Sequence, residues 1–381
     1  MKQVRTGVVG MGGMGYAHCK SVVALEQTQL TCVCDNEEAV VKEKAEEFGV
    51  TPFTDYRKMI QSGLCDAVII AIPHWFHPDV SVCAFENGLH VLSEKPIAVT
   101  VADADRMIKS AQENKRIFSV MLQRRLEPNV SKAFEIVRSG QLGKVIRTLC
   151  VDSWYRTQAY YNSNVWRATW KGEGAGVLIN QAPHMIDIFM VLGGIPERLE
   201  AKTRTRYHQI EVENEVQAIL EYSNGACGYY YTSTFEPVQG HYIEICGERG
   251  KLVLNGSETR FYRYEKSIAE DIAAAEDMWA SLKSEEEKSG AEPDAKKGHI
   301  EIIKNFACAI MNGEKLVSPG EEGLYSVEFC NACILSGMKK KPVSLPINRE
   351  EYTVLIEELK RTSKPKTNVK IQRATDPKYR K

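Results

Sequence analysis

The sequence predicts two domains: an α/β domain with a doubly wound parallel sheet, then an α+β domain with a large, mostly antiparallel, open sheet. Up to about residue 124, strand-like hydrophobic runs alternate with helical runs, the pattern of a parallel sheet covered by helices. A helix-like segment follows at 129–139, and from its end to about residue 260 come runs that alternate with a period of two, interrupted by 160–194, which indicates antiparallel strands. A chain of 381 residues accommodates two ordinary domains. We place them at 1–124 and 125–381.

The first strand-like run, QVRTGVVG, leads directly into the glycine-rich sequence GMGGMG, and a helical stretch follows. Gly10, Gly12 and Gly15 satisfy the pattern G-x-G-x-x-G, which in this context predicts a dinucleotide-binding loop. The first glycine permits a tight turn, the second lets the backbone approach a pyrophosphate, and the third lets the helix pack closely on the strand. Met11 and Met14 belong to the same predicted cofactor-binding loop.

The second hydrophobic run, LTCVCD, ends in Asp35, about twenty residues after the glycine motif, the spacing expected for the acidic residue of such a site. A carboxylate there would accept hydrogen bonds from the ribose hydroxyls and would repel a 2′-phosphate. The following Asn-Glu-Glu offers no arginine to attract one. The sequence therefore predicts NAD rather than NADP.

Further strand-like runs at 66–73, 90–96 and 117–123 alternate with helical stretches. Ligands of doubly wound sheets bind beyond the carboxyl ends of the strands. Residues at these ends are therefore predicted to line the cofactor site: Ile72, Pro73, His77, Glu94 and Gln123.

Lys95 stands at one of these strand ends, between Glu94 and Pro96. The proline biases the preceding residue away from helix. Partial desolvation and a nearby cationic nicotinamide would lower the pKa of the lysine, so that it could take a proton from a substrate hydroxyl. The alternative is a surface lysine paired with Glu94. We predict that Lys95 is the catalytic acid/base.

The segments GVVGMGGMG, AIPHWFH, ENGLHVLSEKPIAVT and SGQLGKV together resemble the glucose–fructose oxidoreductase / inositol dehydrogenase / MocA family, and the likeness extends over nearly the whole chain. The resemblance implies a Rossmann domain, NAD(P)-dependent oxidation or reduction of sugars and cyclitols, and Lys95 as the acid/base. It also implies an open antiparallel sheet with the active site on one face and oligomerisation through the other. We expect a homodimer or homotetramer formed through this sheet.

Asn180, His184 and Asp187 lie within the apolar stretch GVLINQAPHMIDIFM. Spacings of four and three residues would place them in one stripe on a helix. By the resemblance, His184 matches a catalytic histidine, whereas Asn180 stands where relatives carry an acidic residue. An amide can hydrogen-bond a hydroxyl but cannot accept its proton at neutral pH. We predict that His184 is catalytic and that Asn180 and Asp187 bind substrate, although Asp187 could equally anchor the domain interface.

The segment before this stretch is rich in aromatic residues, and sugar sites commonly use aromatic faces and planar hydrogen-bonding groups. Trp166 and Arg167 are therefore predicted to bind substrate, whereas Trp170 could equally belong to the core. The glycines of KGEGAG do not follow a parallel strand, so we interpret them as a flexible hinge.

The composition limits the remaining possibilities. A net charge of -1 does not favour nucleic acid or an anionic membrane as a partner. Eleven scattered cysteines are interpreted as reduced core thiols, and we predict a cytoplasmic protein without a metal site. Residues 265–298 are highly charged and are interpreted as a solvated helix plus loop, with a lid over the sugar site as the alternative.

The combined hypothesis is an NAD-dependent oxidoreductase that transfers hydride between a secondary alcohol of a sugar, glycoside or cyclitol and nicotinamide. Oxidation at C3 of a pyranoside is one form. Two alternatives stay open: a redox glycosidase that recycles its NAD, and a regulator that binds NAD and sugar without turnover.

Overall fold

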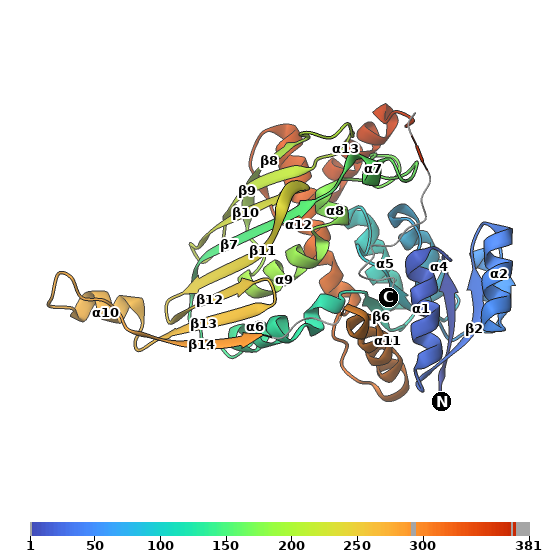
Figure 1. Ribbon diagram of the computed structural model, residues 1–381, viewed down its shortest axis with the longest axis horizontal. Helices are drawn as coiled ribbons and strands as arrows, with labels where there is room; N and C mark the ends of the chain where they lie inside the picture. The colour runs from blue at the N-terminus through green and yellow to red at the C-terminus, as the bar shows by residue number, and fades with distance from the viewer. Residues whose placement is uncertain (1, 291–294, 367–368, 371–381) are drawn as a thin grey trace.

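The computed structural model describes residues 2–290, 295–366 and 369–370. Its strands form two sheets, one of six strands and one of nine. The two sheets lie in opposite halves of an elongated molecule (Figure 1). This arrangement confirms the predicted combination of a doubly wound sheet with a second, mostly antiparallel sheet.

The first sheet is parallel throughout, with the order β3-β2-β1-β4-β5-β6. This is the order of a Rossmann fold, in which the chain reverses direction along the sheet between β1 and β4. Helices cover both faces, so the run at the centre of β4 is apolar and fully buried. The strands are β1 (Val4–Val9), β2 (Thr28–Cys34), β3 (Thr51–Phe53), β4 (Ala67–Ile70), β5 (His90–Ser93) and β6 (Phe118–Val120).

The connecting helices begin and end where the sequence gives ordinary signals. Thr100 accepts a hydrogen bond from the backbone N–H of Asp103 and so caps the helix that follows it. Gly49 ends another helix in the left-handed conformation, at φ 67°. The helical segments are α1 (Gly13–Ala24), α2 (Glu38–Phe48), α3 (Tyr56–Gln61), η1 (His74–Phe76), α4 (His77–Glu86), α5 (Val101–Glu113) and η2 (Gln123–Leu126).

The second sheet has the order β14-β13-β12-β11-β7-β10-β9-β8-β15. All neighbouring pairs are antiparallel except β7 and β10, which run parallel. The strands are β7 (Val145–Tyr155), β8 (Arg198–Arg204), β9 (Glu215–Glu221), β10 (Cys227–Ser233), β11 (Phe235–Gly247), β12 (Gly250–Asn255), β13 (Glu258–Tyr264), β14 (Ser284–Gly290) and β15 (Val343–Ser344).

One face of this sheet packs against helices, and the other is open. In β9, Val216 and Leu220 are buried, whereas Ile219 between them is 56% exposed. Contacts of α9 with β7 and β11, and of α12 with β8, cover the buried face. The helices of this part are α6 (Pro128–Arg138), α7 (Gln158–Tyr161), α8 (Val177–Asn180), α9 (Pro183–Gly193), α10 (Ile268–Ala274), α11 (Ala295–Asn312), α12 (Gly320–Lys339) and α13 (Arg349–Thr362).

The chain returns to the first sheet after completing most of the second. In α11, Ile302 and Phe306 are buried in the same apolar cluster as Val4 and Val8 of β1. A β-bridge then joins Ser119 to Pro319 just before α12. The core beside the six-stranded sheet is therefore built from the first part of the chain and from α11.

The charged segment 265–298 does not cover the first sheet. It forms α10 and the edge strand β14, which pairs with β13. In Figure 1, α10 projects from the end of the second sheet that lies furthest from β1–β6. For its described part, the lid alternative is therefore wrong; residues 291–294 lie outside the described residues.

All eleven cysteines lie in the described residues and are free thiols. Most are buried, but Cys227 is exposed at the start of β10, so the expectation that all belong to the core is wrong for this residue. Within the described ranges, no group of three or more His, Cys, Asp or Glu side chains is arranged to hold a metal ion. The helices described also include none long and apolar enough to cross a membrane.

Candidate active site

The glycine loop between β1 and α1 requires at least two of its glycines. Gly10 has φ +97°, and a Cβ there would lie 2.2 Å from the carbonyl oxygen of Ala71. A Cβ on Gly15 would lie 1.7 Å from the carbonyl oxygen of Gly10, so helix and strand approach too closely for a side chain. A Cβ on Gly12 would meet no protein atom within 4 Å.

These features fit a dinucleotide. No side chain caps the N-terminus of α1, and no acidic residue lies in its first turn. Its N–H groups and the helix dipole therefore favour an anion such as a pyrophosphate beside the open side of Gly12. Met11 is buried under the loop and Met14 is half-buried in the first helical turn.

Asp35 follows β2 directly and contacts the glycine loop. Its Oδ2 accepts a hydrogen bond from the N–H of Met11 at 2.8 Å, and its Oδ1 accepts one from the N–H of Glu37 at 2.9 Å. Two backbone donors hold this carboxylate at the loop. Its contact with a ribose, and its repulsion of a 2′-phosphate, stay predictions.

The residues directly after β5 include Lys95, the predicted acid/base. The Oε1 atom of Glu94 lies 2.7 Å from Nε2 of His18, and its Oε2 accepts a hydrogen bond from the N–H of Lys95 at 3.1 Å. Burial opposes ionisation of Glu94, but the hydrogen bond from His18 and the nearby cations together lower its pKa to about 2. Glu94 therefore stays a carboxylate and fixes the backbone before the lysine.

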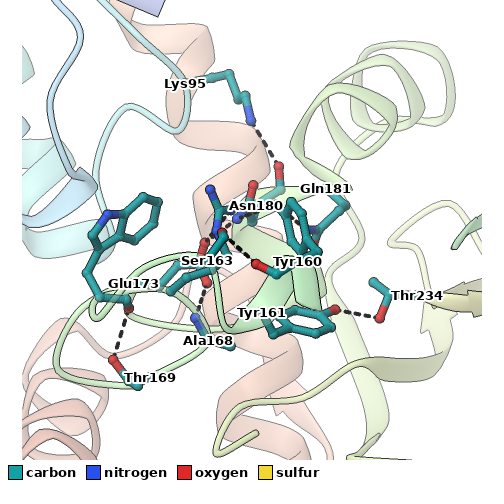
Figure 2. A network of polar contacts seen from close by, with 12 residues as sticks. Lys95, Tyr160, Tyr161, Ser163, Ala168, Thr169, Glu173, Asn180, Gln181 and Thr234 are labelled. Carbon is teal, nitrogen blue, oxygen red and sulfur yellow. Dashed lines mark hydrogen bonds and ion pairs between the residues drawn. The ribbon is translucent and has the colours of Figure 1, made fainter. Parts of the chain in front are cut away.

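The side chain of Lys95 extends from the end of β5 to α8, which belongs to the part of the chain that carries the second sheet. Its Nζ donates a hydrogen bond to the backbone carbonyl of Asn180 at 2.9 Å, as Figure 2 shows. Burial lowers the pKa of Lys95, while the charges of Glu94 and Glu173 oppose the shift. The ammonium is thereby closer to losing its proton near neutral pH than a surface lysine is.

The predicted helical stripe is broken in the structure. One helix, α8, ends at Asn180, and α9 begins at Pro183, so the three polar residues do not share one helix. Asp187 is 1% exposed, and its two oxygens accept hydrogen bonds from Nε and Nη2 of Arg125 at 2.7 and 2.6 Å. The prediction that Asp187 binds substrate is therefore wrong, and the anchoring alternative describes its position.

His184 lies in the first turn of α9 and is half-buried. Its Nε2 is 3.5 Å from Nε2 of Gln123, and its Nδ1 is buried with no hydrogen-bond partner among the described residues. Burial lowers its pKa well below the usual value, and the positive charge of Lys95 lowers it further. The imidazole is therefore neutral near pH 7.

In the aromatic segment, the guanidinium of Arg167 stacks on two aromatic rings. The guanidinium of Arg167 lies 4.3 Å from the ring centre of Tyr160 and 4.7 Å from that of Trp166. Its Nη1 also donates a hydrogen bond to the hydroxyl of Tyr160 at 2.5 Å. Trp166 in turn packs edge-on against His74, which follows β4. Trp170 is 5% exposed and belongs to the core.

The glycines of KGEGAG do not form a hinge, because they are tightly packed. A Cβ on Gly172 would lie 2.3 Å from the carbonyl oxygen of Trp166, and one on Gly176 would lie 1.8 Å from that of Glu213. The flexible-hinge interpretation is therefore wrong. Between these glycines stands Glu173, a buried acid that the sequence analysis missed. A lone carboxylate in a glycine-rich turn was the available signal.

His77 was predicted to contact the cofactor, but it is 0% exposed. Its ring nitrogens lie 2.9 Å from the carbonyl oxygens of Pro96 and Ile72. His77 therefore braces the loops after β4 and β5, and the prediction of direct contact does not fit its position. Ile72 and Pro73 are half-buried at the predicted strand end, and Gln123 is 8% exposed beside His184.

Comparison with known proteins agrees with this geometry. Residues 4–122 match the model of the oxidoreductase family with an NAD-binding Rossmann fold, and residues 130–253 match the GFO/IDH/MocA C-terminal domain. The chain belongs to the GFO/IDH/MocA family. The predicted resemblance is thereby confirmed, and the protein is an NAD-binding oxidoreductase.

Members of the family with established names are similar over most of the chain. Myo-inositol 2-dehydrogenase of Thermotoga maritima is 29% identical over 352 residues, which are 90% of this chain and 98% of that one. Levoglucosan dehydrogenase of Pseudarthrobacter phenanthrenivorans is 26% identical over 315 residues, 73% of this chain and 78% of that one.

Among solved structures, the WlbA dehydrogenase from Bordetella pertussis in complex with NADH and UDP-GlcNAcA has a TM-score of 0.76 at 25% identity. The match covers 91% of this chain and 100% of that one. A levoglucosan dehydrogenase in complex with NADH has a TM-score of 0.78 at 20% identity, covering 91% of this chain and 100% of that one, and supports the fold alone.

Proposed function

We propose that the protein is an NAD-dependent dehydrogenase that oxidises a secondary alcohol of a sugar, glycoside or cyclitol. The observation that carries the proposal is the placement of Lys95. Its ammonium, with a lowered pKa, reaches from the end of the nucleotide-type sheet to Asn180, at the edge of the aromatic segment. Bound NAD supplies the hydride acceptor.

Residues of the chain itself would then remove the proton of the substrate hydroxyl. Neutral Lys95 takes the proton of the hydroxyl at the carbon that is oxidised, a role for which a desolvated amine is suited. His184, kept neutral by burial and by the charge of Lys95, would relay that proton rather than retain it. Asn180, Arg167 and Trp166 hold the remaining hydroxyls and the ring face.

The relatives support this substrate class. Two of them are named for dehydrogenation of inositol and of levoglucosan, both polyhydroxylated rings. The stacked pair of Arg167 and Trp166 offers a planar donor beside an aromatic face, which suits such a ring. Oxidation at C3 of a pyranoside is the form we propose to test first.

The test is a screen of cyclitols, pyranosides and anhydrosugars with NAD and, in parallel, with NADP. Formation of the reduced cofactor is measured by its absorbance at 340 nm. We expect stoichiometric NADH and oxidised sugar with at least one polyol. Release of sugar from a glycoside without net NADH would instead establish the redox glycosidase. Binding of polyol to the NADH complex without any turnover would establish the regulator.

We also propose that copies of the chain associate through the open face of the second sheet. Leu149, Tyr229 and Ile219 lie side by side across β7, β10 and β9, and the last two are 47% and 56% exposed. Light scattering would test this proposal: a dimer or tetramer is expected, and Ile219→Asp should dissociate it.

A further inference from the structure

Glu173 is a buried carboxylate at the edge of the proposed substrate site. It is 1% exposed, and its Oε2 accepts a hydrogen bond from the backbone N–H of Ala168 at 2.6 Å. Its Oε1 accepts one from the side-chain Nδ2 of Asn180, as drawn in Figure 2. The nearest guanidinium atom of Arg167 lies 3.9 Å away. None of the catalytic steps proposed above uses this acid.

These contacts determine which way the amide of Asn180 faces. Both oxygens of Glu173 act as acceptors, Oε2 for the N–H of Ala168 and Oε1 for the NH2 group of Asn180, so the NH2 group of the amide faces Glu173. The same NH2 group lies 3.4 Å from the hydroxyl of Tyr160. The carbonyl oxygen Oδ1 is consequently turned away from both, and among the described residues no donor contacts it.

The amide therefore offers an acceptor next to the catalytic lysine. The backbone carbonyl of Asn180 binds the ammonium of Lys95, so the residue that contacts the acid/base also carries the free acceptor Oδ1. In a polyhydroxylated ring, the hydroxyls on neighbouring carbons lie within hydrogen-bond distance of one another. A substrate whose reacting hydroxyl meets Lys95 brings its neighbouring hydroxyl toward Asn180.

We propose that Glu173 is a positioning residue that selects for a hydrogen-donating hydroxyl beside the carbon that is oxidised. It does so by holding the amide of Asn180 with Oδ1 toward the substrate. The inference rests on the proposed function for its substrate class. It adds a requirement that the proposed function does not contain: the neighbouring group must donate, so a vicinal diol is preferred to an isosteric fluoride.

The chain offers a matched set of variants. In Glu173→Gln, the N–H of Ala168 still requires an acceptor, so the Gln oxygen faces Ala168 and its NH2 group faces Asn180. The amide of Asn180 must then turn and present its NH2 group to the substrate. In the double variant Glu173→Gln/Asn180→Asp, the Gln NH2 group donates to a carboxylate, which again presents an acceptor to the substrate.

The kinetic probes are myo-inositol and methyl α-D-glucopyranoside, each paired with the analogue in which a hydroxyl next to the oxidised carbon is replaced by fluorine. For the full chain, we expect Glu173→Gln to reduce the hydroxyl-to-fluoride ratio of kcat/KM about 10-fold, the value of one hydrogen bond. The change should lie mainly in KM, and the double variant should restore the ratio. An equal loss on both analogues, or a double variant no better than Glu173→Gln, would overturn the proposal.

A second measurement does not depend on turnover. In protein labelled with 15N-asparagine, the side-chain signal of Asn180 is identified by its absence in Asn180→Asp. We expect one NH2 proton to be shifted downfield by the carboxylate in the wild-type chain and to lose that shift in Glu173→Gln. An unchanged signal would refute the contact even if the enzyme is active. A shifted signal in a chain that oxidises neither probe would uphold the contact and count against the proposed function.

Discussion

Arg125→Met should destabilise the protein strongly, because it leaves a buried charge without its partner. The side chains of Arg125 and Asp187 are each 2% exposed, and the two groups make a bidentate contact. Arg125 also donates to the carbonyl oxygen of Val317 at 3.1 Å and contacts Glu322. Removing one member of a buried pair costs about 3–5 kcal/mol, so we expect a loss of that size in the free energy of unfolding.

The matched control is the double variant Arg125→Met/Asp187→Leu, which removes both charges and should recover most of the loss. Urea unfolding followed by circular dichroism measures all three proteins. In Arg125→Met the loss in free energy of unfolding should become smaller as the pH falls. Burial raises the pKa of Asp187, so on acidification this carboxyl is protonated at a higher pH in the folded state than in the unfolded state, which removes the unpaired charge. A single variant within about 1 kcal/mol of wild type, or a double variant as unstable as the single one, would refute the reasoning.

The other predictions concern the site. Lys95→Met should lower kcat by about 10²–10⁴-fold with NADH affinity unchanged, and undiminished turnover would contradict its proposed role. In the wild-type chain, kcat/KM for oxidation should rise with pH through an apparent pKa below 10.5, because burial lowers the pKa of Lys95 and the neutral amine is the base; a profile flat in this range would argue for another base. Asp35→Ser should weaken NAD and reduce the preference over NADP, measured by fluorescence titration with NADH and NADPH. Gly15→Ala should abolish NADH binding, since its Cβ would lie 1.7 Å from a carbonyl oxygen; normal binding and an unchanged melting temperature would show that the loop can yield.

The features that the sequence predicted well are determined by neighbours along the chain. The glycine loop, Asp35 and Lys95 each follow a strand, and the parallel sheet brings strand ends to one edge without further information. The helix break between Asn180 and His184 was harder to predict, since apolar residues keep their helical spacing across it. Pro183 was the signal, because proline is favoured in the first turn of a helix and disfavoured in its interior.

The features that the sequence did not predict depend on distant partners. The sequence around Asp187 suggested a site residue, because its partner Arg125 lies 62 residues earlier and the contact between them forms only in the folded chain. Glu173 stands out only as a lone carboxylate in a glycine-rich turn, and the sequence does not indicate that its partner is Asn180. His77 follows a strand end like the other predicted cofactor residues, but two backbone carbonyls in separate loops hold its ring inside.

The packing of α11 on β1 has a consequence for synthesis of the protein. Ile302 and Phe306 complete an apolar cluster that begins at Val4. A ribosome that has produced only the first third of the chain has therefore released a sheet with one flank uncovered. Domains generally fold as units during translation. The first domain, however, cannot complete this cluster until α11 has been synthesised, after most of the second sheet. A fragment ending at residue 124 should consequently be aggregation-prone, whereas a fusion of that fragment to residues 295–319 should be better behaved.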